Sequence, residues 1–145
     1  MTHATHAAAP PAPASSTGTP VGSYQPGVCN IGPAEIARRR RSGHIGLAIT
    51  IVVFVVLVVL HVPPLVRLTV GLPAAGAASG YLQAAFKFCA GFASRGVFNF
   101  GELGQTHEVV DPESHARDRS RGNRILLGAL AVGMVVAIVA VVVPL

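Results

Sequence analysis

The chain has 145 residues, of which 51% are hydrophobic and 12% are charged, and its formal net charge is +5 at pH 7. A soluble domain carries about 25% charged residues, so this composition argues against a soluble globular protein. The positive charges cluster beside apolar runs, as membrane anchors do, which argues equally against a nucleic-acid-binding protein.

Residues 1–28 are rich in alanine, proline, glycine and serine and offer almost nothing that a core could bury. Pro10, Pro11 and Pro13 favour the extended polyproline II conformation. We therefore expect a disordered tail. It also lacks the charged start and apolar core of a secretory signal.

Residues 29–44 are predicted to form a basic helix next to the membrane. Pro33 suits the first helical position, where its missing N–H is not needed. Glu35 then falls in the first turn, where the helix dipole favours an anion. Gly32 or Asn30 could cap this helix.

Four consecutive arginines lead this helix to Ser42-Gly43, which offers a joint before the membrane. We interpret the arginines as a membrane anchor at the level of the lipid headgroups. The alternative is a binding site for an anionic lipid or ligand. The four residues are Arg38, Arg39, Arg40 and Arg41.

Three apolar segments follow, and each is predicted to cross a membrane as a helix. The first, residues 45–63, lies within a stretch without formal charge that extends from residue 42 to residue 66. At about 1.5 Å per residue, about 20 residues cross a hydrocarbon core of about 30 Å. Pro63 and Pro64 are expected to end this helix.

The second segment, residues 68–86, is less apolar but rich in small side chains. Gly76, Gly80 and Ala84 recur every four positions, so a neighbouring helix could approach closely. We expect this helix to be surrounded by protein, and Pro73 could kink it.

The third segment, residues 125–144, is again free of charge. Ala129, Gly133 and Ala137 repeat the four-residue spacing of small side chains. We expect them to pack against the small side chains of the second helix.

Residues 87–124 are predicted to form a cytoplasmic loop between the second and third helices. Residues 106–110 have the composition of a short strand, and Asp111-Pro112-Glu113 has the form of a helix start with Asp as its cap. Between Arg95 and Arg124 the loop carries five arginines and five carboxylates, so its formal charge is close to zero. It is not predicted to be a polybasic binding arm.

Three crossings would place ten of the eleven basic residues on one side of the membrane, with Arg67 as the exception. Without the second crossing the basic residues would divide four to seven. The positive-inside rule therefore favours three crossings, with the N-terminus in the cytoplasm and the C-terminus outside. Abundant arginine, alanine, valine and glycine are typical of a high-GC bacterial genome and indicate the bacterial plasma (inner) membrane. The predicted fold class is an all-α integral membrane protein with three transmembrane helices.

Two cysteines are the residues best able to carry chemistry. Cys29 precedes the first helix and Cys89 follows the second, so the predicted topology places both at the cytoplasmic surface, where thiols stay reduced. Assisted by His44, this thiol pair could bind a soft metal or carry sulfur or redox equivalents, since nearby arginine and lysine favour the thiolate. The alternative is two small side chains buried in the protein.

The beginning of the first helix has a distinctive order of residues: Asn30, Ile31 and Gly32, then Glu35, Arg38, Arg39, Gly43 and Gly46. Over about residues 30–89 the chain resembles the small YgaP-like hairpin proteins of bacterial inner membranes. In that family an Asn-x-Gly and arginine-containing segment leads into two apolar helices, and the second ends near a cysteine. The resemblance implies a helical hairpin with Cys89 in that place, and some members are fused to a rhodanese sulfur-transfer domain. This chain has Phe88-Cys89-Ala90 where the family has a Cys-Pro pair.

No other pattern indicates catalysis, a cofactor or a metal. Metal-ligand spacings such as HExxH are missing from the sequence, and no charged residue lies inside a predicted span. The sequence therefore predicts a small non-enzymatic membrane protein that is a structural or accessory subunit. Its expected partners are membrane lipids and either copies of itself or a larger membrane protein. The alternative function is that of a cytoplasmic-face thiol protein that uses Cys29 and Cys89.

Overall fold

The computed structural model describes residues 23–143, and 71% of them are helical. Most of the predicted disordered tail lies outside the described residues. Its last part, residues 23–28, is described and leads into a turn, in which the backbone of Gln25 pairs with that of Cys29. The prediction of a tail as far as residue 28 is therefore corrected, because the chain is already folded around this turn.

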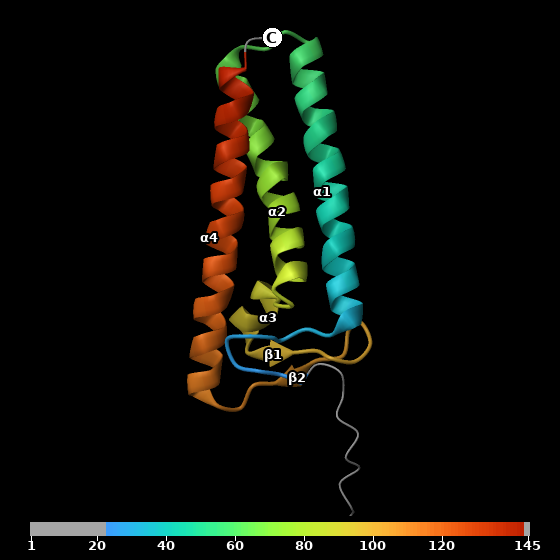
Figure 1. The fold of residues 1–145 in the computed structure, drawn as a ribbon, viewed down its shortest axis with the longest axis vertical. Coiled ribbons are helices and arrows are strands. Elements are labelled where there is room, and N and C mark those ends of the chain that lie inside the picture. Colours follow the sequence, from blue (N-terminus) through green and yellow to red (C-terminus); the bar gives the residue numbers. More distant parts are fainter. Residues whose placement is uncertain (1–22, 144–145) are drawn as a thin grey trace, which may run out of the picture.

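Three long helical segments lie side by side and alternate in direction (Figure 1). At one end of the molecule, a short helix and a two-stranded hairpin connect the second long segment to the third. The strands pair antiparallel, with Val97 opposite Glu108. In chain order the elements are α1 (Pro33–Val59), the 3₁₀ helix η1 (Pro64–Val70), α2 (Gly71–Ala85), α3 (Ala90–Arg95), β1 (Val97–Phe98), β2 (His107–Glu108) and α4 (Pro112–Val142).

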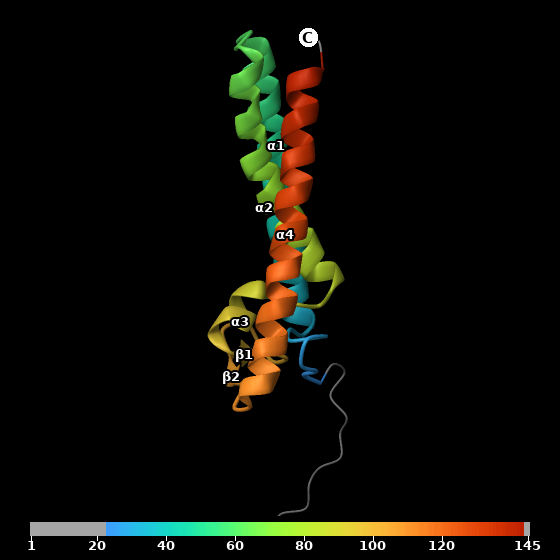
Figure 2. The same cartoon turned by 90° about the vertical axis from the view of Figure 1, so that its left-hand side faces the viewer.

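The charged residues gather at the end that carries α3 and the hairpin. We call this end, residues 23–41 and 86–124, the polar base, and the remainder, residues 42–85 and 125–143, the apolar stem. Figure 2 shows α3 and the hairpin on one side of α4 and the N-terminal segment on the other. The base is thus built around the first half of α4.

α1 is one continuous helix, whereas the sequence predicted a basic helix and a separate membrane span. It begins at Pro33 after Gly32 and ends at Val59, ahead of the two prolines. Gly43 is no joint. It lies against the ring of Tyr81 on α2, where an added Cβ would come within 3.1 Å of the ring atoms. Its missing side chain lets the two helices approach, and the helix continues through it.

Pro73 changes the hydrogen-bond pattern of the second apolar segment. The structure has η1 followed by α2 where the sequence predicted one helix over residues 68–86. Proline has no N–H for the carbonyl of Thr69 and its ring crowds that carbonyl, so the α pattern cannot extend further back. The backbone nevertheless keeps helical torsion angles through Val70 and Gly71.

The predicted loop at residues 87–124 is shorter in the structure, because α4 already starts at Pro112. Asp111 caps this helix, and its side chain accepts a hydrogen bond from the backbone N–H of Ser114. The helix continues without interruption into the third apolar segment. The strand expected within residues 106–110 is present as β2.

α1 and α4 are long and apolar enough to cross a membrane, by length and composition. α2 has 15 residues, too few to cross without η1. It packs against both α1 and α4, which make almost no direct contact with each other. Protein therefore flanks the second helix on two sides, as expected from its small side chains.

Candidate functional site

Asn30 joins the N-terminal segment to the start of α3. Its side chain is fully buried; Nδ2 donates to the carbonyl of Cys89 at 3.0 Å, and Oδ1 accepts from the N–H of Cys89 at 2.6 Å. Its backbone N–H donates to the carbonyl of Lys87, and its carbonyl accepts from the N–H of Asn99. Three segments distant in sequence therefore meet at this one residue.

Arg39 reaches from α1 to the sulfur of Cys89. Nη2 of Arg39 donates to Sγ at 2.8 Å, and Cys89 is only 1% exposed. Arg39 follows the buried Glu35 by one helical turn, so both lie on the same face of α1. Oε2 of Glu35 is buried and has no hydrogen-bond partner among residues 23–143.

The other three arginines of the run, Arg38, Arg40 and Arg41, are exposed. Arg38 lies 3.4 Å from Oε1 of Glu35. Arg39 differs from these three because it contacts Cys89 inside the base, and a headgroup anchor stays a prediction for the run.

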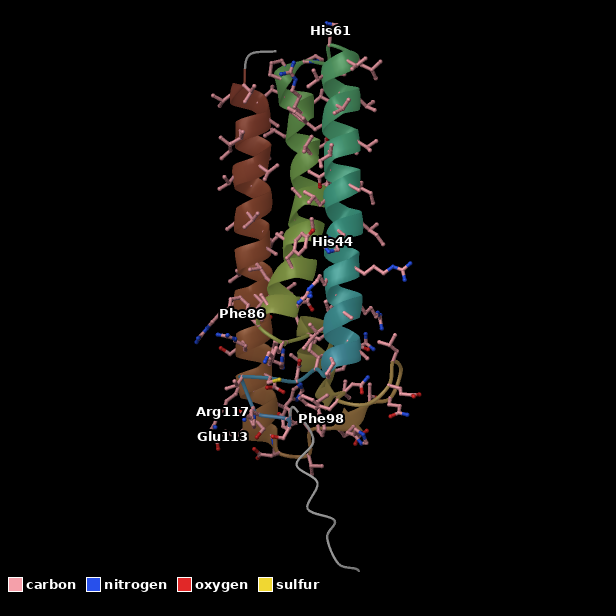
Figure 3. The ribbon with its side chains drawn as sticks, turned by 45° about the vertical axis from the view of Figure 1, so that its right-hand side comes forward. His44, His61, Phe86, Phe98, Glu113 and Arg117 are labelled. Atoms are coloured by element: carbon pink, nitrogen blue, oxygen red, sulfur yellow. The ribbon has the colours of Figure 1, made fainter. Side chains whose placement is uncertain are left out.

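The two cysteines of the predicted thiol pair make different contacts in the structure. Sγ of Cys29 contacts the carbonyl of Ile31 at 3.7 Å, whereas the sulfur of Cys89 contacts Arg39. Both thiols are free. His44 lies farther along α1, in the apolar stem (Figure 3), and its Nδ1 is 2.6 Å from the hydroxyl of Tyr81. Within residues 23–143 no group of three potential metal ligands is close enough to hold an ion.

Asp118 ties the N-terminal turn to α4. This fully buried carboxylate accepts from the hydroxyl of Tyr24 at 2.9 Å and from the N–H of Gly27 at 2.7 Å. Burial raises the pKa of the Tyr24 phenol well above its usual value, and the hydrogen bond to Asp118 raises it further. The ring of Tyr24 also stacks on Phe98, with 4.5 Å between centroids.

The small side chains of the second helix divide between its two neighbours. Gly80 faces α1, where an added Cβ would lie 2.6 Å from the backbone nitrogen of Gly43. Gly76 has open space around its Cβ position, with nothing within 4 Å. Ala84 is buried. We expected these three residues to share one face and to pack against the third helix. The structure corrects this prediction, because Gly80 packs against α1 and Gly76 has no neighbour within the described residues at its Cβ position.

The small side chains of the third helix do pack on the second segment, at different partners from those expected. Gly133 lies against Gly71 and Ala75, and an added Cβ would approach the carbonyl oxygen of Gly71 to 2.6 Å. Ala137 also contacts Gly71, and Ala129 is buried. The contact between α2 and α4 thus lies one to two turns nearer the start of α2 than predicted.

A hollow of about 210 Å³ lies between α1 and α4. Its wall is almost entirely apolar: Thr50, Ile51, Phe54, Val70, Val136, Val139 and Ala140.

Comparisons with protein families, with curated proteins and with solved structures found no match to this chain. Its function must be inferred from the arrangement of its own residues.

Proposed function

We propose that this chain is a non-enzymatic integral membrane protein of the bacterial plasma membrane, and that it is a structural or accessory subunit of a membrane assembly. The observation that carries the proposal is the division of its surface. Apolar side chains of α1 and α4 are exposed along the stem, for example Val52, Val59, Leu127 and Val135. The charged side chains, apart from Arg67, belong to the base. Such a surface suits a hydrocarbon layer bounded by headgroups on one side.

The uncharged parts of the two long helices are matched in length. In α1 the uncharged part runs from residue 42 to Val59, and in α4 from residue 125 to Val142. At the rise of an α-helix, each is about 27 Å long, close to a hydrocarbon core of about 30 Å. The η1–α2 segment returns between them, which supports a third crossing.

The orientation follows from the basic residues of the base, which the positive-inside rule places in the cytoplasm. Arg67, the basic residue at the other end, is only 6% exposed. Its Nη1 lies 3.4 Å from the carbonyl oxygen of Val143, beyond the last turn of α4. A cation at a helix C-terminus is electrostatically favourable, so this arginine has a local role at the outer end.

Reporter fusions test this topology. A reporter that is active only outside the cytoplasm should be active after Leu145, and a fluorescent protein that matures only in the cytoplasm should stay dark there. Insertion of the same two reporters at Gly104, in the exposed part of the base, should give the opposite pattern. A fluorescent fusion at Leu145 would contradict the three-span arrangement.

The hollow between α1 and α4 supports a role as a subunit, because apolar side chains from a helix of another chain could fill it. That chain is either a second copy or a larger membrane protein. In a background without native cysteines, Ile51→Cys and Val136→Cys should crosslink to another chain in native membranes. Leu127→Cys, on the exposed side of α4, is the control and should crosslink weakly. A protein that stays monomeric both after crosslinking and in mild detergent would contradict the subunit role.

The thiol function is the second candidate, and the contact between Nη2 of Arg39 and the sulfur of Cys89 supports it. It predicts that Cys29 and Cys89 form a disulfide under mild oxidant and that both react with a membrane-permeant maleimide. The burial of Cys89 favours the other outcome, in which Cys29 alone reacts until the protein is unfolded. Reaction of Cys89 in the folded protein would favour the thiol function.

A further inference from the structure

Two arginines of α4 lie where its polar first half passes into its apolar second half. Arg121 and Arg124 are three positions apart and therefore neighbours on one helix face. Residue 125 begins the uncharged run immediately afterwards. In a membrane, this level of α4 corresponds to the boundary between headgroups and hydrocarbon.

Two adjoining hollows meet at these arginines. The first, of about 320 Å³, is polar and is lined by Pro26, Gly27, Arg117, Ser120, Arg121 and Arg124. The second, of about 300 Å³, extends along the stem and is lined by Leu82, Phe86, Arg121, Arg124, Ile125 and Gly128. Because both arginines line both hollows, a cationic pocket adjoins an apolar groove between α2 and α4.

Two of the three arginines of this pocket, Arg121 and Arg124, are not paired with the carboxylates nearby. Glu113 pairs with Arg117, and the oxygens of Asp118 accept from Tyr24 and Gly27. Within residues 23–143, neither Arg121 nor Arg124 forms an ion pair with a carboxylate. The pocket therefore has two positive charges available for an anion.

Arg121 also shows an unused hydrogen-bond donor. Its guanidinium carbon lies 4.9 Å from the centroid of the Phe86 ring, which holds the group against the end of α2. Its Nε is buried and has no hydrogen-bond partner within the described part of the chain. A buried donor of this kind is costly unless an acceptor is supplied. Figure 3 shows Phe86 beside α4, between the stem and the Arg117–Glu113 pair of the base.

We propose that these hollows bind one anionic phospholipid of the cytoplasmic leaflet. Its phosphate accepts hydrogen bonds from Arg121 and Arg124, and the start of one acyl chain lies along Leu82, Ile125 and Gly128. A lipid suits this site better than a free phosphate, because an apolar groove adjoins the cationic pocket at the same two arginines. The inference rests on the proposed membrane insertion, with the base on the cytoplasmic side.

Binding is tested on the purified full-length protein in mild detergent, titrated with phosphatidylglycerol or with phosphatidylcholine. Native mass spectrometry counts the bound lipid. We expect one phosphatidylglycerol to bind in preference to phosphatidylcholine. Arg121→Gln with Arg124→Gln should weaken this binding about thirty-fold, or about 2 kcal/mol, since each arginine contributes about 1 kcal/mol near anionic lipid.

The matched control is Arg95→Gln with Arg119→Gln, which removes the same charge from exposed positions of the base. This pair should bind phosphatidylglycerol nearly as the wild type does. An equal loss in both pairs would overturn the site, because the attraction would then depend on net charge alone. Thermal melting shows whether each pair folds. If the double variant Arg121→Gln, Arg124→Gln does not fold, Arg124→Gln alone gives the same test, because it leaves the stacked Arg121 in place.

Gly128→Leu tests the apolar groove without changing charge. The new side chain would fill the space beside Leu82, and we expect at least about a tenfold loss of phosphatidylglycerol binding, comparable to the removal of a buried apolar contact. Glycerol phosphate, which has the headgroup charge but no acyl chain, should fail to displace the lipid. Efficient displacement would show a soluble phosphate site and overturn the lipid assignment. The reporter fusions at Leu145 test the topology independently, so failure of the lipid site and failure of membrane insertion give different results.

Discussion

The side-chain amide of Asn30 satisfies both backbone groups of Cys89, 59 positions later in the chain. It donates to the carbonyl and accepts from the N–H, as a paired strand would. Because both bonds are buried, they connect the N-terminal segment rigidly to the turn between α2 and α3. The polar base therefore depends on a residue that lies ahead of the first helix.

Replacing Asn30 with alanine should destabilise the protein by about 3 kcal/mol. The buried N–H of Cys89 loses its partner, at about 1–3 kcal/mol, and the carbonyl of Cys89 keeps only the N–H of Ala93, at about 1 kcal/mol for the lost bond. Thermal unfolding in detergent micelles, followed by far-UV circular dichroism, measures the loss. Asn123→Ala is the matched control, since Asn123 is exposed on α4. It should leave the melting temperature nearly unchanged. A similar small effect at Asn30 would contradict the structural role.

The sequence could not predict this clamp, because nothing local marks Asn30 as a partner of Cys89. The starts of the helices were easier to predict from the sequence. Asp111 and Pro33 occupy their predicted positions, since caps and proline act within one turn of the chain. Contacts between distant segments depend on how the helices pack, and a single sequence does not contain that information in a readable pattern.

Gly80 and Gly76 should respond oppositely to substitution by alanine. At Gly80 the new Cβ would meet backbone atoms of Gly43 and the carbonyl of Arg39, all within 2.9 Å, so α1 and α2 would have to separate. We expect a loss of about 2 kcal/mol, typical of overpacking. At Gly76 the Cβ meets open space, and alanine should stabilise by about 0.5–1 kcal/mol through helix propensity. Reversible unfolding in mixed micelles measures both, and equal effects would contradict the assigned helix faces.

The same two glycines show why the small-residue spacing gave the wrong neighbour. A step of four positions turns an α-helix by about 400°, so residues spaced by four drift about 40° around the axis at each step. Gly76 and Ala84 are therefore on clearly different directions of α2. Which direction meets α1 and which meets α4 depends on the packing of the whole bundle.

The near-zero charge of the predicted loop gave no sign of the pair Arg121 and Arg124, because only the helix brings these two residues to one face.

The start of α4 should loosen in acid. Hydrogen bonds from the hydroxyl and N–H of Ser114 lower the pKa of the Asp111 carboxyl below its usual range. A lowered folded-state pKa stabilises the folded form above the unfolded pKa of about 3.9, and this stabilisation is lost as the pH falls through the folded-state value. We therefore expect the amide of Ser114 to exchange faster below about pH 4, relative to the rest of α4.

Asp111→Asn separates this effect from general acid unfolding. Asparagine is an effective N-cap that does not titrate. In this variant the protection of the Ser114 amide should be nearly constant across the acid range. If both proteins lose protection at the same pH, the carboxyl of Asp111 is not the group responsible.

The contact between Tyr24 and Asp118 should make the base sensitive to alkali. Burial, and then the hydrogen bond to Asp118, raise the pKa of the Tyr24 phenol above its usual value of about 10. A raised folded-state pKa contributes stability that is complete below about pH 10 and is lost as the pH rises through the folded-state value.

Tyr24→Phe keeps the ring on Phe98 but removes the hydroxyl that donates to Asp118. It should lower stability by about 1.5 kcal/mol near neutral pH, in the range for hydrogen bonds to charged groups. Above about pH 10 the difference between the two proteins should shrink. Thermal melts across this range measure it, and in a Tyr81→Phe background Tyr24 is the only tyrosine, so phenolate absorbance reports its ionisation directly. Ionisation near pH 10 in the folded protein would contradict the buried contact.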